Sequence, residues 1–217
     1  MIRLLCLAIG YLFGLFQTSY ILGRVHGIDI REYGSHNAGT TNMLRTMGLK
    51  AGLLTFAGDC GKCILAVVLV RVVFGKTHAD ILPLLEFYAA AGTILGHNYP
   101  FYLKFKGGKG IAATAGLIIS TTNIWIVLIC LATFIVIVAA TRYVSLGSMT
   151  VVTIYLISVI VCGQHGGFGV ENVSYLHEMY GVAAFLMILA FWRHRANIKR
   201  LLSGTENKIS VGGKDKK

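Results

Sequence analysis

Charged residues are scarce in this chain of 217 residues. They make up 13% of the sequence, whereas apolar residues make up 55%. Soluble domains usually carry about 25% charged residues, so this composition excludes an ordinary soluble protein. A helix needs about 20 mostly apolar residues to cross a membrane, and it satisfies its own backbone groups there. We therefore predict an integral membrane protein built from helices.

Several chemical signatures are also missing. The five cysteines lie mostly in apolar segments and indicate no disulfide framework. Cys60 and Cys63 form a C-x-x-C without a second thiol or histidine pair, so we interpret them as packing residues. His165, Glu171 and His177 match no metal-ligand spacing. No metal or other cofactor is expected, because lysine and arginine can neutralise an anionic substrate.

The apolar residues gather in seven stretches. They predict an all-α membrane protein, a polytopic bundle of seven transmembrane helices that forms a single domain over residues 1–217. The fourth stretch is short for a span, so we expect it to be tilted, extended by its neighbours or packed inside the bundle. From about residue 205 we expect a flexible basic tail. The stretches cover residues 2–22, 51–74, 81–96, 111–122, 124–141, 149–163 and 180–192.

Basic residues follow the membrane topology. If the spans alternate, most lysines and arginines fall on the face formed by residues 23–50, 97–110, 142–148 and 193–217. The positive-inside rule makes this face cytoplasmic, with the N-terminus outside and the C-terminus inside. The net charge of +11 therefore does not indicate nucleic acid as a partner, and no obligatory protein partner is evident.

The first cytoplasmic loop carries "GSHNAGTTNMLRTMG", residues 34–48. Glycines let backbone N–H groups turn toward a ligand, hydroxyls and amides donate hydrogen bonds, and arginine offers a planar fork to phosphate. A turn that enters a helix adds the positive end of the helix dipole. The alternative is a polar loop that only caps the next helix. The candidate binding residues here are Ser35, Asn37, Thr41, Asn42 and Arg45.

The second cytoplasmic loop carries "GHNYPFYLKFKGGKG", residues 96–110. A lysine flanked by glycines can approach an oxyanion closely, although flexible loops share this composition. The spacing is not that of a nucleotide-binding P-loop. We expect His97, at the membrane boundary, to be a hydrogen-bonded interfacial residue. The candidate residues are Lys104, Gly107, Gly108, Lys109 and Gly110.

A third cluster combines "TRYVSLGS", residues 141–148, with "HRANIKRLLSGTE", residues 194–206. His194 and Asn197 share one helical face, and histidine can act as a general base near neutral pH. Ser145 and Ser148 lie at a helix junction. We interpret Arg195, Lys199 and Arg200 as a positive-inside anchor rather than as site residues.

Acidic groups are few on the cytoplasmic side. They are mainly Asp29, Glu32 and Glu206, so we do not expect a carboxylate base, and Glu206 fits better as a structural partner of nearby basic groups. Within the second span, Asp59 and Lys62 are three residues apart, and we expect an intramembrane pair that supports the site.

Four motifs quoted above occur in this order along the chain: residues 34–48, 96–110, 141–148 and 194–206. Together, they resemble the bacterial acyl-phosphate-dependent glycerol-3-phosphate acyltransferase family. The resemblance covers nearly the whole chain; His36 departs from it, because the family commonly has glycine at this position. The family implies seven transmembrane helices in the bacterial inner membrane, with an extracytoplasmic N-terminus and a cytoplasmic active site. It also implies transfer of a fatty acyl group from acyl phosphate to the 1-hydroxyl of glycerol 3-phosphate. The products are lysophosphatidic acid and inorganic phosphate, in the first acylation of phospholipid synthesis.

Two phosphate-bearing substrates require two anion sites. We expect Arg45, Lys109, Ser145, His194 and Asn197 to hold glycerol 3-phosphate, and the glycine-rich turns to hold the acyl phosphate. The acyl chain would lie in an apolar groove between helices. We favour direct transfer, with Ser35 positioning the hydroxyl and His194 or the substrate phosphate accepting its proton. The expected catalytic residues are Ser35, His194 and Lys109; the expected binding residues are Arg45, Asn37, Thr41, Asn42, Lys104, Gly107, Gly108, Gly110, Ser145, Ser148 and Asn197.

Two other classes of protein fit parts of the sequence. A transporter or channel for a small phosphate-bearing anion also uses broken helices and basic clusters. A transport path, however, should place polar residues near mid-membrane in several spans, whereas these motifs gather on one face. A non-catalytic membrane scaffold leaves the clusters of glycine, hydroxyl and amide groups unexplained.

Overall fold

The computed structural model describes residues 1–209 of the chain, and this part is helical without strands. The part of the expected basic tail beyond residue 209 lies outside the described residues. The elements are α1 (Ile2–Gly14), α2 (Thr18–Val25), the 3-10 helix η1 (Ile30–Glu32), α3 (Thr40–Met47), α4 (Leu49–Phe74), α5 (Leu82–Asn98), the 3-10 helix η2 (Phe101–Leu103), α6 (Ile111–Thr121), α7 (Ile124–Thr141), α8 (Val144–Gln164), α9 (Val173–Arg193) and α10 (Arg195–Leu202).

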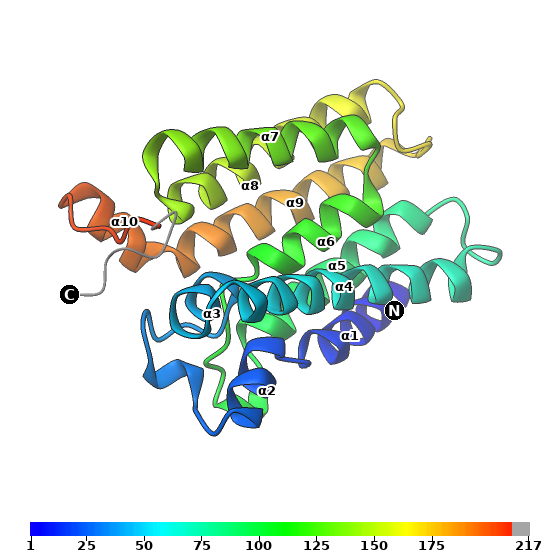
Figure 1. The fold of residues 1–217 in the computed structure, drawn as a ribbon. Coiled ribbons are helices and arrows are strands. Elements are labelled where there is room, and N and C mark those ends of the chain that lie inside the picture. Colours follow the sequence, from blue (N-terminus) through cyan, green and yellow to red (C-terminus); the bar gives the residue numbers. More distant parts are fainter. Residues whose placement is uncertain (210–217) are drawn as a thin grey trace.

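The long helices run side by side between two ends of a bundle (Figure 1). One end holds the N-terminus and the loops 75–81 and 165–172. The other end, called the cavity end below, holds α3, α10 and the loop 99–110. The three motif regions, far apart in sequence, therefore meet at one end of the molecule.

Within the described residues 1–209, five stretches are long and apolar enough to cross a membrane: Ile2–Val25, Leu49–Phe74, Ile124–Thr141, Val144–Gln164 and Val173–Arg193. Helix α5 has 17 residues and α6 has 11. At 1.5 Å per residue, α6 is about 17 Å long, which is well short of a hydrocarbon core of about 30 Å. A helical membrane protein is thus confirmed, whereas the count of seven spans stays a prediction.

Helix α5 lies at the centre of the bundle and is packed very closely against α1. Gly10 and Gly14 on α1 face Gly92 and Gly96 on α5, and a Cβ on any of the four would collide with the backbone of the other helix. Small residues four apart are the usual means by which membrane helices approach this closely. Together with its contacts to α4, α6 and α9, this packing buries almost the whole length of α5.

The first predicted span, residues 2–22, is not one helix. Residues 15–17 separate α1 from α2, which leaves carbonyl groups at the end of α1 without helical partners. Gln17 Nε2 donates to Gly14 O at 3.1 Å, and Lys62 Nζ donates to Phe16 O at 2.6 Å. The break is stable because buried side chains replace the missing backbone hydrogen bonds.

The expected pair between Asp59 and Lys62 is present, with Lys62 Nζ 2.9 Å from Asp59 Oδ1. Both side chains are buried, and Thr18 Oγ1 donates to the same carboxylate oxygen at 3.1 Å. The Nδ1 atom of His97 lies 2.9 Å from Lys62 Nζ. A polar cluster thus joins α2, α4 and α5 beneath the loop 99–110.

The beginning of the expected tail has specific contacts. Ile209 N donates to Arg142 O at 2.8 Å, and Arg142 Nε donates to Ile209 O at 3.1 Å. Arg45 donates to Asn207 O at 3.2 Å, and Glu206 is buried. Residues 205–209 therefore form part of the packed structure, unlike the flexible tail that we expected to start at residue 205.

Candidate active site

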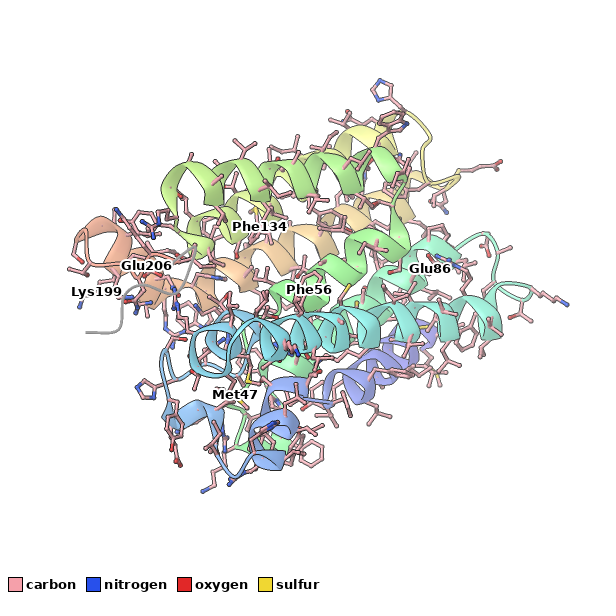
Figure 2. The ribbon with its side chains drawn as sticks, viewed as in Figure 1. Met47, Phe56, Glu86, Phe134, Lys199 and Glu206 are labelled. Atoms are coloured by element: carbon pink, nitrogen blue, oxygen red, sulfur yellow. The ribbon has the colours of Figure 1, made fainter. Side chains whose placement is uncertain are left out.

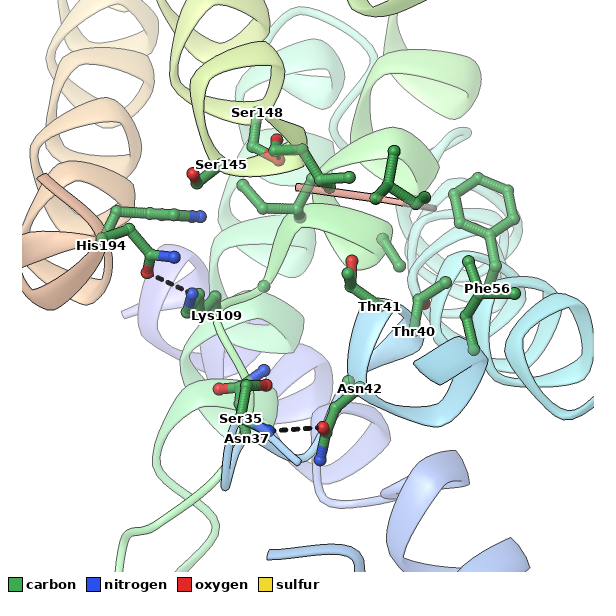
Figure 3. Close-up of a pocket in the computed structure, with 18 of the residues that line it drawn as sticks. Ser35, Asn37, Thr40, Thr41, Asn42, Phe56, Lys109, Ser145, Ser148 and His194 are labelled. Carbon is green, nitrogen blue, oxygen red and sulfur yellow. Dashed lines mark hydrogen bonds between the residues drawn. The ribbon is translucent and has the colours of Figure 1, made fainter. Parts of the chain in front are cut away.

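A cavity of about 280 Å³ opens at the cavity end. Its walls come from α3 and the loop before it, α4, α5, α6, α7, α8, α10 and the junction between α9 and α10 (Figure 3). Eleven of the fourteen residues predicted for the site line it: Ser35, Asn37, Thr41, Asn42, Arg45, Lys109, Gly110, Ser145, Ser148, His194 and Asn197. Lys104, Gly107 and Gly108 do not line it.

Helices α3, α6 and α8 begin at this cavity. The N-terminal caps of α3, α6 and α8 are Gly39, Gly110 and Tyr143, and none of these caps accepts a hydrogen bond with its side chain. The first N–H groups of a helix have no partner within the helix, and the helix dipole is positive there. Their convergence makes the cavity suited to anions.

Lys109 contributes the most enclosed positive charge to the cavity. Burial lowers the pKa of its ammonium group to about 8, although the nearby Glu206 carboxylate acts in the opposite direction. Lys109 Nζ donates to Asn197 Oδ1, as Figure 3 shows by a dashed line. Arg45 adds a second positive charge at the exposed mouth of the cavity.

Glu206 organises the opposite wall. Its Oε1 accepts hydrogen bonds from Asn197 Nδ2 at 2.8 Å and from Ser145 Oγ at 3.1 Å. Its Oε2 accepts from Arg200 Nε at 2.8 Å. Because Asn197 Nδ2 faces Glu206, the amide oxygen of Asn197 faces Lys109. The expectation that Glu206 pairs with basic groups is confirmed, and its contact with two site residues was not foreseen.

His194 is buried at the junction of α9 and α10 and reaches into the cavity (Figure 3). Burial and the charge of Lys109 lower the pKa of its imidazole to about 4, so the ring is neutral near pH 7. Nδ1 lies 2.8 Å from Ala190 O, and a carbonyl oxygen can only accept, so Nδ1 carries the proton. Nε2 then offers a lone pair. His194 is suited to accept a hydrogen bond from a substrate hydroxyl and is a weak base.

The loop before α3 forms the mouth of the cavity. Ser35 is exposed there, and its backbone N–H donates to Asn42 Oδ1 at 2.8 Å. The amide nitrogen of Asn42 donates to Ile30 O and Tyr33 O, both at 3.0 Å. Asn42 therefore holds the loop in shape with its side chain. His36 has a φ of 55°, a conformation that favours glycine, and its exposed ring lies outside the cavity.

The glycine-rich loop differs from the predicted anion cradle. Gly107 N donates to Asn98 O at 3.2 Å, and Gly108 N donates to His97 O at 3.1 Å. These two N–H groups are therefore already used. A Cβ at Gly108 would also collide with the His97 ring. Both glycines are needed for close packing on the end of α5, and neither has a free N–H group with which to hold the acyl phosphate as we expected.

Lys104 lies elsewhere on the surface. It is exposed, has a φ of 54° and lines a separate, open depression of about 660 Å³ together with Lys106, Gly107 and Arg193. The tight turn after η2 directs Lys104 away from Lys109, although only five positions separate them. The prediction that Lys104 lines the same site as Lys109 was wrong.

An apolar wall completes the cavity. Phe56 on α4 and Phe134 on α7, both labelled in Figure 2, line it together with Val138 and Val144. Phe56 is 42% exposed on the outer surface of the bundle. The cavity thus joins a positively charged region to a hydrophobic side that reaches the outer surface of the bundle.

Several polar side chains line the cavity that the sequence did not assign to the site itself: Thr40, His97, Arg200, which we interpreted as a membrane anchor, and Asp59, which we expected only to support the site. Asp59 reaches the inner end of the cavity from α4, and Thr40 lies at the start of α3. Within residues 1–209, Asp59 Oδ2 and Thr40 Oγ1 are buried without a hydrogen-bond partner. Thr40 lies within the motif of residues 34–48, so that signal was available. The position of Asp59 depends on how deeply α4 enters the bundle.

A family model described as glycerol-3-phosphate acyltransferase matches residues 4–204. Among curated proteins, a glycerol-3-phosphate acyltransferase of Clostridioides difficile (strain 630) is 42% identical over 202 residues, which are 93% of this chain and 92% of the relative. One from Thermoanaerobacter pseudethanolicus (strain ATCC 33223 / 39E) is 39% identical over 211 residues, which are 96% of each chain.

Solved structures show the same relationship. A crystal structure of PlsY (YgiH), an integral membrane glycerol 3-phosphate acyltransferase, in its glycerol 3-phosphate form has a TM-score of 0.82 and 29% identity, and the match covers 96% of each chain. The lysophosphatidic acid form has a TM-score of 0.79 and 28% identity, over 96% of this chain and 95% of the other.

Proposed function

This chain belongs to the glycerol-3-phosphate acyltransferase family, and we propose that its acyl donor is a fatty acyl phosphate. It is an acyltransferase of phospholipid synthesis. In the proposed reaction, the 1-hydroxyl of sn-glycerol 3-phosphate receives the acyl group, and the products are lysophosphatidic acid and inorganic phosphate.

A single cavity that joins cationic and apolar walls carries this proposal. Lys109, Arg45 and the helix N-termini suit phosphate groups, whereas Phe56 and Phe134 suit an acyl chain that enters from the membrane. A water-soluble phosphate ester and a lipid-borne donor can therefore meet without either one leaving its own phase.

The site residues have distinct roles in this mechanism. Lys109 exchanges its contact with Asn197 for the phosphate of glycerol 3-phosphate, and Arg45 closes on the same phosphate from the mouth. Ser145 and Asn197, both held by Glu206, complete the binding wall. His194 accepts a hydrogen bond from the attacking hydroxyl at Nε2. Ser35 positions the attacking hydroxyl, and Asn37 and Thr41, with the N–H groups that begin α3, hold the phosphate of the donor.

The chemistry needs orientation more than a strong base. Acyl phosphate is a mixed anhydride, and the substrate oxygen forms a bond to its carbonyl carbon while the bond from that carbon to the phosphate oxygen breaks. The hydroxyl proton moves to His194 Nε2 as the new bond forms and from there to the departing phosphate, so no external acid or base is consumed. Pre-organised donors and correct positioning supply the rate enhancement. We propose direct transfer, because Ser35 lies at the exposed mouth with no base hydrogen-bonded to its side chain in the described residues.

The membrane arrangement follows from the same proposal. We propose seven spans, α1 with α2 counting as one, with the N-terminus extracytoplasmic and the cavity end in the cytoplasm of a bacterial cell, at the inner membrane. Support comes from the basic residues at the cavity end. The short α6 is packed against α4 and α5 inside the bundle, where a helix need not match the bilayer thickness.

Turnover by purified protein in lipid nanodiscs tests the proposal. Palmitoyl phosphate with glycerol 3-phosphate should release inorganic phosphate and form lysophosphatidic acid in equal amounts. Omission of glycerol 3-phosphate, or replacement of the donor by palmitoyl-CoA, should abolish product formation. Formation of product from palmitoyl-CoA alone would assign a different donor. Uptake of glycerol 3-phosphate by proteoliposomes without any acylation would favour a transporter.

A further inference from the structure

Arg193 contacts the loop that carries Lys109. Its Nε donates to Gly108 O at 3.1 Å, and one terminal nitrogen donates to Gly107 O at 2.9 Å and to Gly108 O at 2.6 Å. The guanidinium group lies over the ring of Tyr99, 5.1 Å from its centroid. One planar side chain thus binds two successive carbonyl groups and is itself held from the other side.

The opposite face of the loop is held by α5. The N–H groups of Gly107 and Gly108 donate to the last carbonyl groups of α5, and the Gly108 backbone packs against the His97 ring. That ring is fixed in turn by Lys62. Both peptide faces before Lys109 are therefore bound, by α5 on one side and by Arg193 on the other.

Lys109 follows directly from this clamped segment. Its long side chain has many rotamers, so the position of its Cα decides whether Nζ meets Asn197 and the cavity. After Lys109, Gly110 has a φ of 84° and begins α6. The backbone on both sides of Lys109 is thus set by specific geometry, and on one side this geometry depends on Arg193.

We propose that Arg193 is a positioning residue that places Lys109 by binding the Gly107 and Gly108 carbonyl groups. The proposal rests on the proposed function, in which Lys109 binds the phosphate of glycerol 3-phosphate. Loss of this contact should therefore mainly lower kcat/KM for glycerol 3-phosphate. It should change KM for the acyl donor less, because the proposed donor site lies at α3.

Arg195 offers a matched control on the same chain turn. It is exposed, donates to Trp192 O at 3.1 Å and lies over the Trp192 ring at 5.0 Å. It therefore has the same kinds of contact as Arg193, a carbonyl and an aromatic ring, but none with the loop 99–110. A difference in kinetics between Arg193→Ala and Arg195→Ala therefore reports the contact of Arg193 with the loop 99–110.

Steady-state kinetics of the full chain in nanodiscs test the proposal. Arg193→Ala should lower kcat/KM for glycerol 3-phosphate by about 100-fold, the size of effect expected when a reacting group is displaced by about 1 Å. KM for palmitoyl phosphate should change less than about threefold. Arg195→Ala should stay within about twofold of the wild-type protein in both parameters. Added guanidinium should restore part of the activity of Arg193→Ala and none of that of Lys109→Met.

The outcomes separate the possibilities. An Arg193→Ala protein with wild-type kcat/KM, or a loss that falls equally on both substrates and does not respond to guanidinium, would overturn the clamp. If this variant does not fold, Arg193→Lys decides, because an ammonium group cannot bind two carbonyls as a fork. A tenfold or greater loss in Arg193→Lys supports the proposal, and wild-type kinetics overturn it. An inactive wild-type protein would refute the proposed function itself, and the inference would fall with it.

Discussion

The two ends of the bundle use their charges differently. At the end that holds the N-terminus, Arg3 makes two hydrogen bonds to Glu178, at 2.7 and 2.9 Å, and Arg71 makes two to Glu86, at 2.6 and 2.9 Å. These arginines have a carboxylate each. Figure 2 labels Glu86 at this end and Glu206 at the other.

At the cavity end the positive charges exceed their partners. Lys109, Arg45 and Arg200 line one cavity with Glu206, which already binds Arg200, whereas Asp59 is bound to Lys62. The N-termini of α3, α6 and α8 add to the positive potential. At the cavity end, the surplus of positive charge can bind an anionic ligand. At the end that holds the N-terminus, each arginine is paired with a carboxylate, and the pairs only hold helices together.

The largest expected effect comes from removing the central charge of the cavity. Lys109→Met should lower kcat/KM for glycerol 3-phosphate about 1000-fold, because a charged donor inside a water-poor site is lost. Steady-state kinetics in nanodiscs measure this, with folding checked by gel filtration. Lys104→Met is the matched control and should stay within about threefold, since Lys104 lies outside the cavity. Equal losses in both variants would place the two lysines in one site after all.

A smaller loss is expected from the one carboxylate that organises the cavity wall. Glu206→Gln should lower kcat/KM about 30-fold, because Arg200 loses its partner and the hold on Asn197 weakens. The same assay measures the loss. Glu171 is exposed at the other end of the bundle. The control variant Glu171→Gln makes the same chemical change there and should have no effect on kcat/KM. Wild-type kinetics in Glu206→Gln would show that the network does not order the site.

The pH dependence should report the ammonium group of Lys109. Its pKa of about 8 means that kcat/KM for glycerol 3-phosphate falls tenfold per unit above this pH, as the charge is lost from the free enzyme. The pH profile of kcat should fall at a higher pH, because bound phosphate favours the charged lysine. In Glu206→Gln the fall should begin at lower pH, since the Glu206 carboxylate raises the pKa of Lys109. A flat profile from pH 7 to 10 would mean that Lys109 stays charged throughout.

The smallest effect on activity is expected at the end that holds the N-terminus, where each arginine is paired with a carboxylate. Arg3→Met should lower the thermal midpoint, because Glu178 loses its bidentate partner, while kcat/KM stays within about twofold. Both side chains are about one third exposed, so the loss of stability should be modest. Differential scanning fluorimetry with parallel kinetics measures both. A tenfold loss of activity without a lower midpoint would mean that the two ends are functionally coupled.

The comparison also explains what the sequence could predict. Apolar composition and loop charge were enough for a helical membrane protein with its motifs gathered at one end. Lys104 and Lys109 look equivalent in their motif, and so do Arg193 and Arg195, which flank His194 in the sequence. They differ through backbone angles and through contacts with distant helices, which sequence spacing does not contain. The break after α1 similarly depends on Lys62, 46 residues beyond the carbonyl group of Phe16 that it binds.

Calorimetric binding of glycerol 3-phosphate at pH 8 tests the central claim most directly. With Lys109 half protonated in the free protein, the account predicts uptake of about half a proton on binding, seen as a difference in heat between two buffers of unlike ionisation enthalpy. Lys109→Met should bind weakly and take up none. Tight binding by wild-type protein without proton uptake would contradict the claim that the substrate phosphate balances Lys109.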